Sequence, residues 1–192
     1  MFPRQFFREL PVKKAQILKL VTALAFGCSI TSAYAQSTTD ISVTATVDQS
    51  CTITAQPLNF GKYDPTSTTD NAKSSSISLT CVKNSKPTVT LSLGKNTGLN
   101  GSERRMSNGT EFLSYEVFKP VATDPAIDQP GTACSTNGAE TVVWGADLAT
   151  GLHPPAATDR TSKDFFLCGV IKAGQDVGTG SYSDVLTAKI EF

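Results

Sequence analysis

Apolar and polar residues alternate along much of this chain, and this period of two limits the possible fold more than any other feature. Residues 41–47 read Ile-Ser-Val-Thr-Ala-Thr-Val, and residues 77–81 read Ile-Ser-Leu-Thr-Cys. Neighbouring side chains of a β-strand point to opposite faces, so this alternation is typical of strands with one buried face. The apolar residues nowhere follow the spacing of a convincing amphipathic helix. The sequence therefore predicts an all-β domain.

Turn-forming residues interrupt the alternation at short intervals and divide the chain into short strands and long loops. Trp144 is expected in the core because tryptophan is usually deeply buried, whereas Arg104 and Arg105 are expected in a solvated turn. Seven or so short strands with long loops indicate a sandwich of immunoglobulin-like size. We expect strands at 41–47, 58–60, 77–81, 89–93, 112–118, 141–144, 165–171 and 182–192, with long polar connections at 64–76, 94–101, 119–140 and 151–162.

The first 35 residues have the pattern of a secretory signal. A basic region precedes an apolar run from Leu20 to Ile30, and Ala33-Tyr34-Ala35 offers a small-x-small cleavage site. The run is about 11 residues long, short of the roughly 20 that a membrane-spanning helix requires. An uncleaved anchor and a lipoprotein signal at Cys28 are the alternatives. We expect cleavage after Ala35, which divides the chain into a signal peptide at 1–35, an N-terminal extension at 36–50 and one domain at 51–192.

Composition gives no support for nucleic-acid binding or catalysis. Five of the 17 basic residues but only one of the 17 acidic residues precede residue 36, so the rest of the chain is net acidic. A net acidic chain has no basic field to hold a nucleic acid. The one histidine, His153, lies beside two prolines and has no recognisable nucleophile or carboxylate partner. We expect no enzyme, no cofactor and no small-molecule substrate, with a hydrolytic periplasmic enzyme as a weak alternative.

Four cysteines remain after the expected signal, an even number in a chain sent to an oxidising compartment. Disulfides are therefore expected, and a zinc site is the competing interpretation, weakened by the absence of a C-x-x-C motif and by the single histidine. Four cysteines allow three pairings. We favour Cys51 with Cys81 and Cys134 with Cys168, because each pair joins near neighbours in the expected order of strands.

The two ends of the domain do not match a closed sandwich. The last expected strand runs to Phe192, and its apolar residues occupy alternate positions, so they point to one face. We expect no later strand to cover the edge of this strand. At the other end, the alternating segment 41–47 precedes the first cysteine of the domain. This segment is either the first strand of its own domain or a strand donated to the open edge of another copy, and the alternation alone does not decide between them. A head-to-tail donation of this kind does not close, so it propagates a fibre.

A series of short pieces runs through almost all of residues 51–192. The pieces are Cys51-Thr52-Ile53, Leu58 to Pro65, Leu79-Thr80-Cys81, Leu91 to Gly94, Arg105-Met106, Leu113 to Phe118, Trp144-Gly145, Gly169 to Gln175, Gly180 to Asp184, and a last strand ending in Phe192. In their number and order these pieces resemble the secreted spore coat protein U domain family, which includes subunits of archaic chaperone-usher pili such as the Csu pili of Gram-negative bacteria.

The resemblance implies an incomplete immunoglobulin-like β-sandwich that is completed by a donor strand from another subunit or a chaperone. It implies a pilin disulfide between Cys51 and Cys81. Its implied partners are a periplasmic pilus chaperone, an outer-membrane usher and neighbouring pilin subunits, with export through the periplasm to a cell-surface pilus that serves attachment and biofilm formation. Carried over residue by residue, the donor set is Ile41, Val43, Ala45 and Val47, and the acceptor-groove strand is Tyr182, Leu186, Ala188, Ile190 and Phe192.

Two departures from the family pattern bear on the role of the subunit. The connection at 119–140 is long, and Cys134 with Cys168 forms a second pair that the resemblance does not require. We therefore expect a minor, adaptor or stalk subunit, because adhesive tip subunits resemble two-domain proteins. The alternative is a stand-alone secreted coat-like β-sandwich that does not polymerise.

Overall fold

The computed structural model describes residues 36–98, 101–120, 127–135 and 140–192, and the predicted signal segment lies outside these ranges. The described residues form an all-β fold, which confirms the predicted class, and they include no helix that could cross a lipid bilayer. The strands are β1 (Cys51–Ala55), β2 (Asn71–Cys81), β3 (Thr88–Leu91), β4 (Arg104–Ser107), β5 (Phe112–Phe118), β6 (Lys163–Ile171) and β7 (Ala188–Glu191).

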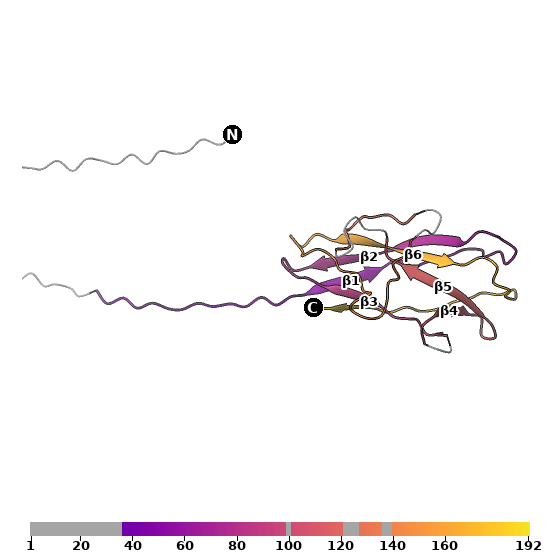
Figure 1. Ribbon diagram of the computed structural model, residues 1–192. Helices are drawn as coiled ribbons and strands as arrows, with labels where there is room; N and C mark the ends of the chain where they lie inside the picture. The colour runs from indigo at the N-terminus through magenta and orange to yellow at the C-terminus, as the bar shows by residue number, and fades with distance from the viewer. Residues whose placement is uncertain (1–35, 99–100, 121–126, 136–139) are drawn as a thin grey trace, which may run out of the picture. The chain divides into compact units, whose positions relative to one another are not determined.

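Within residues 45–192 the strands form two antiparallel sheets, as Figure 1 shows. The larger sheet has the order β1-β2-β6-β5-β4, and the smaller sheet pairs β3 with β7. Side chains from both sheets meet in one core cluster, in which Ile77 and Leu167 of the larger sheet join Val89 and Leu91 of the smaller one. The arrangement is a sandwich, because the apolar face of each sheet is buried against the other.

The pairing of β2 with β6 forms the centre of the larger sheet. The two strands pair over nine positions, from Asn71 opposite Ile171 to Leu79 opposite Lys163. Both strands carry side chains of the main cluster on the face toward the smaller sheet. On the opposite face of β6, Cys168 and Val170 join Phe118 in a second, smaller cluster, so β6 is buried on both sides.

Arg104 is a charged residue inside the core, and the prediction of a solvated turn at this position was wrong. Its side chain is 2% exposed on β4. The guanidinium donates hydrogen bonds to the carbonyl oxygens of Ser92, Leu91 and Trp144. Trp144 is fully buried, as expected, and its indole N–H donates to the carbonyl of Val89. The bonds from Arg104 connect β4 to β3 and to the residue after it, because a guanidinium group has several N–H donors and can bind several acceptors at once.

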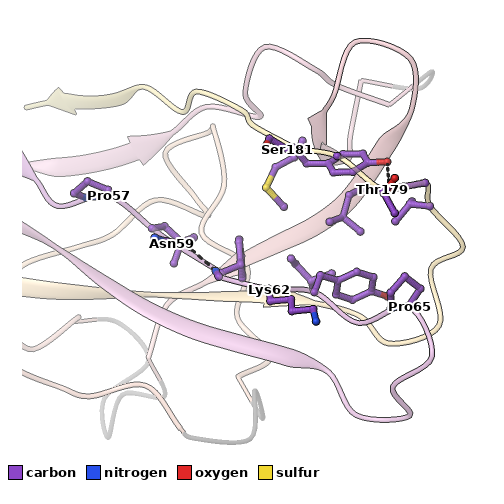
Figure 2. Close-up of a pocket in the computed structure, with 17 residues that line it drawn as sticks. Pro57, Asn59, Lys62, Pro65, Thr179 and Ser181 are labelled. Atoms are coloured by element: carbon purple, nitrogen blue, oxygen red, sulfur yellow. Dashed lines mark hydrogen bonds between the residues drawn. The ribbon is translucent and has the colours of Figure 1, made fainter.

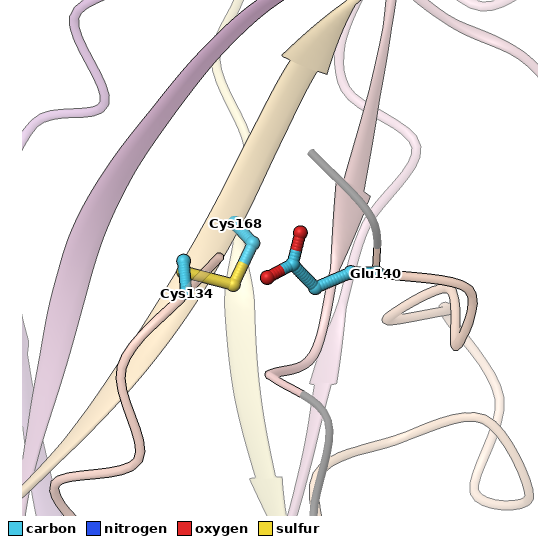
Figure 3. A group of neighbouring side chains, drawn as sticks. All are labelled: Cys134, Glu140 and Cys168. Carbon is cyan, nitrogen blue, oxygen red and sulfur yellow. A yellow bond between two sulfur atoms is a disulfide. The ribbon is translucent and has the colours of Figure 1, made fainter. Parts of the chain in front are cut away.

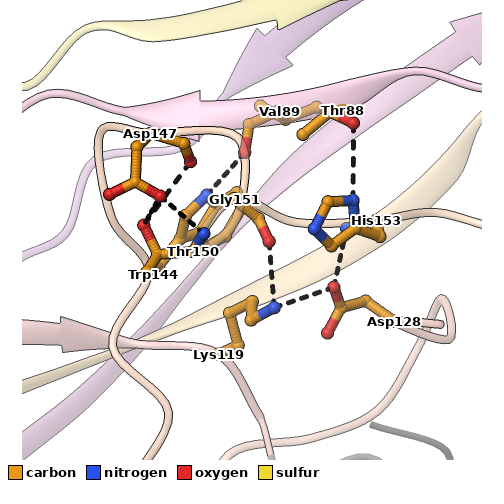
Figure 4. Close-up of polar contacts among 9 residues, drawn as sticks. All are labelled: Thr88, Val89, Lys119, Asp128, Trp144, Asp147, Thr150, Gly151 and His153. Carbon is orange, nitrogen blue, oxygen red and sulfur yellow. Dashed lines mark hydrogen bonds and ion pairs between the residues drawn. The ribbon is translucent and has the colours of Figure 1, made fainter. Parts of the chain in front are cut away.

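A buried ion pair anchors two of the loops, as Figure 4 shows. Lys119 Nζ lies 3.2 Å from Asp128 Oδ2 and donates to the carbonyl of Gly151 at 2.9 Å. The same Asp128 oxygen accepts the backbone N–H of His153. Lys119, Asp128 and Glu140 are all at least nine-tenths buried, so the prediction that 119–140 is a surface loop was wrong at these three positions.

Several predicted strand boundaries differ from the structure. Segment 58–60 forms no strand, and Thr141 to Trp144 contributes only an isolated bridge between Val143 and Phe118. The predicted polar loop through residue 76 is wrong from Asn71 onward, because long-range pairing with β6 makes this polar stretch a strand. The last predicted strand is regular only from Ala188 to Glu191, with a single bridge at Ser183. Strand β4 was not expected.

Both disulfides join the pairs that the sequence order favoured. Cys51 and Cys81 are opposite partners in the β1–β2 register, with Cα atoms 4.0 Å apart. Cys134 and Cys168 join the loop at 127–135 to β6, with Cα atoms 5.6 Å apart. The first bond holds the start of the domain to the large sheet. The second holds the long connection to the opposite face of the same sheet.

We predict that Arg104→Gln lowers the free energy of unfolding by about 3 kcal/mol, because buried carbonyls lose a charged donor that glutamine replaces only in part. Urea denaturation of the full chain measures the change. Arg160→Gln is the matched control, because Arg160 is exposed in a loop. Equal midpoints for the two variants would show that the buried fork is not needed for stability.

Candidate functional site

Among the described residues four strands end a sheet, and the outer sides of β3 and β4 are bridged to Leu152 and Ser183, whereas β1 and β7 carry no such bridge. Strand β1 pairs with β2 on one side, and β7 pairs with β3 on one side. No strand is paired to the other edge of either one within the described ranges. Open edges leave backbone N–H and C=O groups free to bind another strand. The surface between these two edges is therefore the first place to look for a binding site.

A groove, which we call the edge groove, adjoins these two edges and is lined by Ala55 at the end of β1 and Ala188 at the start of β7. One wall is the segment 55–65, which continues from β1, and the other is the segment 177–188, which leads into β7. It consists of two cavities of about 420 and 660 Å³. The cavities share Leu58, Phe60, Met106 and Tyr182 in their linings, so they are adjoining parts of one groove.

The wall formed by 182–190 has the alternation that the sequence predicted. Tyr182, Leu186, Ala188 and Ile190 are half-buried, while the residues between them, apart from Asp184, are exposed. These four residues pack against the main core from its rim. Phe192, the fifth residue of the predicted acceptor set, is 60% exposed and follows the end of β7. The acceptor role of the set remains a prediction.

Within the wall at 55–65, Leu58 and Phe60 lie against the sheet and form the floor of the groove. The sequence analysis did not assign these two residues to a site. Leu58 and Phe60 lie over Gly169 of β6, where an added Cβ would come within 2.6 Å of Leu58 Cδ2 and 2.7 Å of Phe60 Cζ. The ring of Phe60 meets Tyr115 edge-on, with centroids 5.9 Å apart. The missing side chain at Gly169 therefore allows segment 58–60 to lie down on the sheet, and this close approach explains why a glycine occurs within a buried strand.

Asp184 holds the second wall in place. Its Oδ2 accepts the Tyr115 hydroxyl at 2.8 Å, and its Oδ1 accepts the backbone N–H of Lys95 at 2.8 Å. The carboxylate occupies the space beside Gly94, where a Cβ would come within 1.9 Å of Oδ2. The apolar alternation of the last strand is broken at this one position, so the sequence did mark it, although its role could not be assigned.

Burial shifts the pKa of Tyr115, which lines the groove, and of two charged residues near it in the sequence. Burial, with the hydrogen bond to Asp184, raises the pKa of Tyr115, so its hydroxyl stays neutral and donates. Burial also lowers the pKa of Arg104 and raises that of Glu116. The larger cavity has a polar rim, where the Tyr182 hydroxyl donates to Glu111 Oε2 at 2.9 Å. Figure 2 shows Asn59 and Lys62 on one side of this cavity and Thr179 and Ser181 on the other.

The predicted donor residues lie outside every strand of the described chain. Ile41, Val43 and Val47 are 83%, 89% and 79% exposed. Ala45 is exposed as well, and residues 36–50 form no strand. These apolar side chains alternate strictly with polar ones and are exposed in the part of the chain that the structure describes.

The described residues offer one group that could hold a metal ion, and it lies outside the edge groove. It consists of Cys134, Glu140 and Cys168. His153 is half-buried, and its Nδ1 lies 3.4 Å from the Thr88 hydroxyl. Its backbone N–H donates to Asp128 Oδ2, the same oxygen that forms the ion pair with Lys119. These contacts give His153 a structural role.

With this geometry described, the chain can be compared with known proteins. The family model for the Spore Coat Protein U domain matches residues 36–189, so the chain belongs to that family. Protein U of Myxococcus xanthus is 28% identical over 173 residues, which cover 82% of this chain and 86% of that protein. The family defines the protein as an all-β domain of the spore coat U type.

The chain is similar to two solved structures. One is the pre-assembly complex of the chaperone CsuC and the tip adhesion subunit CsuE from the archaic chaperone-usher Csu pili of Acinetobacter baumannii. It is 25% identical with a TM-score of 0.50, and the match covers 77% of this chain but 40% of that chain. The other is a chaperone-usher pilus, 14% identical with a TM-score of 0.45, and the match covers 82% of this chain and 96% of that chain.

The raised pKa of Tyr115 predicts a loss of stability at alkaline pH. Above the ordinary value of 10.0 the unfolded chain ionises this phenol while the folded chain does not, so stability falls as pH rises toward the folded pKa. Tyr115→Phe is expected to be less stable by about 1 kcal/mol at neutral pH, and this deficit should narrow above the ordinary tyrosine pKa. Denaturation of both chains at neutral and alkaline pH measures this. A deficit that stays constant with pH would contradict it.

Proposed function

We propose that this protein is a structural subunit of a chaperone-usher pilus that polymerises by strand donation. The observation that carries the proposal is the edge groove, an apolar cleft that adjoins the unpartnered edges of β1 and β7, in a chain whose N-terminal segment exposes an alternating apolar set. A strand laid in the groove would pair with free backbone groups, while its alternate side chains would fill the cavities. The likeness to the CsuE–CsuC complex supports this proposal.

The donor in this proposal is the segment with Ile41, Val43, Ala45 and Val47 from another subunit. Seven residues extend roughly 23 Å as a strand, a length suited to crossing a sandwich sheet. Burial of the three larger side chains contributes very roughly 5 to 8 kcal/mol before ordering costs. Before assembly, a periplasmic chaperone would cover the same groove, and an outer-membrane usher would mediate the exchange.

The direction of the donated strand follows from the two walls of the groove. The smaller cavity joins residues 55–60 to 182–188, and the larger joins 57–65 to 177–182, so the walls run in opposite directions. The chain therefore enters β1 at the same end of the groove at which β7 ends. In a head-to-tail fibre, the N-terminal segment of each subunit leaves at the end of the groove where β1 begins. The N-terminal segment of the neighbouring subunit therefore enters the groove at the opposite end. The donor then runs antiparallel to β7, with Ile41 reaching toward Ile190.

In this proposal the subunit is exported through the periplasm of a Gram-negative bacterium and becomes part of a cell-surface pilus that serves attachment and biofilm formation. We propose a stalk, minor or adaptor position for this subunit. The second candidate is a stand-alone coat-like protein that does not polymerise. The likeness to Protein U of Myxococcus xanthus over most of both chains favours keeping this alternative.

We predict that Val43→Asp abolishes head-to-tail oligomers while Thr44→Asp does not. In a donated strand the side chain at 43 enters the groove, where an ionised carboxylate is costly to bury, and the side chain at 44 faces outward. The full chain is co-expressed with its chaperone and usher, and oligomers are counted by native mass spectrometry. Oligomers of Val43→Asp that match those of Thr44→Asp would contradict the proposed donor register.

A synthetic peptide of residues 38–48 should bind the Val43→Asp chain, because that chain keeps an intact groove but carries a defective donor. Binding should raise the thermal midpoint in a concentration-dependent way, because the peptide binds the folded state alone. The same peptide carrying Val43→Asp should have no effect, and the peptide carrying Thr44→Asp should bind normally. A Val43→Asp chain that binds none of the peptides would favour the stand-alone coat-like protein.

A further inference from the structure

Three potential metal ligands gather on the face of β6 that points away from the sandwich core. Cys168 belongs to the second cluster, and Cys134 is packed against it. Figure 3 shows the carboxylate of Glu140 directed at the sulfur atoms of this pair. The two sulfur atoms and one carboxylate oxygen all lie within 4.8 Å of one another. Within the described ranges this is the one such group of three.

The carboxylate of Glu140 has an unsatisfied atom in this structure. The residue is 5% exposed. Its Oε1 accepts the backbone N–H of Ser135, while Oε2 is buried without a hydrogen-bond partner, the one such side-chain atom found in the described residues. A disulfide has no proton to donate to this oxygen, and an unpaired buried carboxylate oxygen is costly. The position of Glu140 is therefore unexplained when the cysteines are joined.

We propose that in its dithiol form this site binds Zn²⁺ through Cys134, Cys168 and Glu140. Two thiolates and one carboxylate are ordinary zinc ligands, and three protein ligands leave the fourth tetrahedral position to water. Binding releases the two thiol protons, and the charge of the cation satisfies the free oxygen of Glu140. The Ser135 N–H holds the other oxygen and orients the carboxylate, as outer contacts commonly do for metal ligands.

The dithiol form needs no reductant, because cysteines enter every chain as thiols. A disulfide oxidant converts the pair to Cys134–Cys168 by taking two electrons and is itself reduced to a dithiol. Zinc is then lost, since a disulfide sulfur has no thiolate charge to offer. The site therefore passes from a metal-bound dithiol to the disulfide seen here. In both states the loop at 127–135 stays attached to β6.

The pair Cys51–Cys81 provides an internal comparison. Both residues belong to or pack against the main core, and no described acidic or histidine side chain completes a ligand group with them. The proposed zinc site also lies on the opposite face of the large sheet from the edge groove. Because nothing in the zinc proposal uses the groove, either proposal can fail without the other.

The test uses the full chain with Cys28→Ser, reduced with a dithiol reagent and freed of it without oxygen. We expect it to bind one Zn²⁺ in competition with a chromophoric chelator, and zinc should protect Cys134 and Cys168 from alkylation, as read by peptide mass spectrometry. Glu140→Gln keeps the shape of the side chain but should weaken affinity by roughly tenfold or more, since even an outer-contact loss costs that much.

Two further variants separate the cysteine pairs. Cys51→Ser with Cys81→Ser should still bind one Zn²⁺, and Cys134→Ser with Cys168→Ser should bind none. If a double variant fails to fold, the alkylation pattern of the chain with all four cysteines still decides which pair zinc protects. Equal affinity of Glu140→Gln and the parent chain, or protection of Cys51 and Cys81 instead, would overturn the proposal.

Discussion

Backbone hydrogen bonding at the two open edges is the constraint on which the rest of this structure depends. A strand must satisfy its N–H and C=O groups, and β1 and β7 each satisfy one side only within the described chain. The same two edges adjoin an apolar groove, so unpaired backbone groups and half-buried apolar side chains occur together there. Tyr182 and Leu186 line this groove and pack against the core from its rim.

The walls of the edge groove are held by contacts behind them, and none of these contacts crosses the opening. The β1 wall is fixed by the Cys51–Cys81 bond and by the Gln56 N–H donating to the carbonyl of Ser76. The β7 wall is fixed by the hydrogen bond from the Tyr115 hydroxyl to Asp184 and by two backbone hydrogen bonds between Ser107 and Ser183. A groove held open in this way pays little ordering cost on binding, because only the incoming strand has to be fixed.

Alternation in the sequence was a good guide where a segment packs against the core, but the alternating segment 41–47 forms no strand in the described chain. Local spacing predicted the sandwich class and the alternating wall of the groove, residue type predicted the burial of Trp144, and the expected order of strands predicted the cysteine pairs. It missed β4, since a buried arginine such as Arg104 is stable only where distant carbonyls receive it. It also missed Leu58 and Phe60 as the groove floor, because their position depends on Gly169, which is more than 100 residues away. Long-range pairing likewise made a strand of the polar stretch that opens β2.

Strand β6 separates the two chemical regions of the molecule. Its core-facing side, at Gly169, supports the floor of the groove, and its other side, at Cys168, holds the long connection through Cys134. Alternation along one strand thus places the floor of the groove on one face of the large sheet and the Cys134–Cys168 bond on the other. The proposed strand donation and the proposed zinc binding therefore use opposite faces of the same sheet, and no residue named for one of them is named for the other.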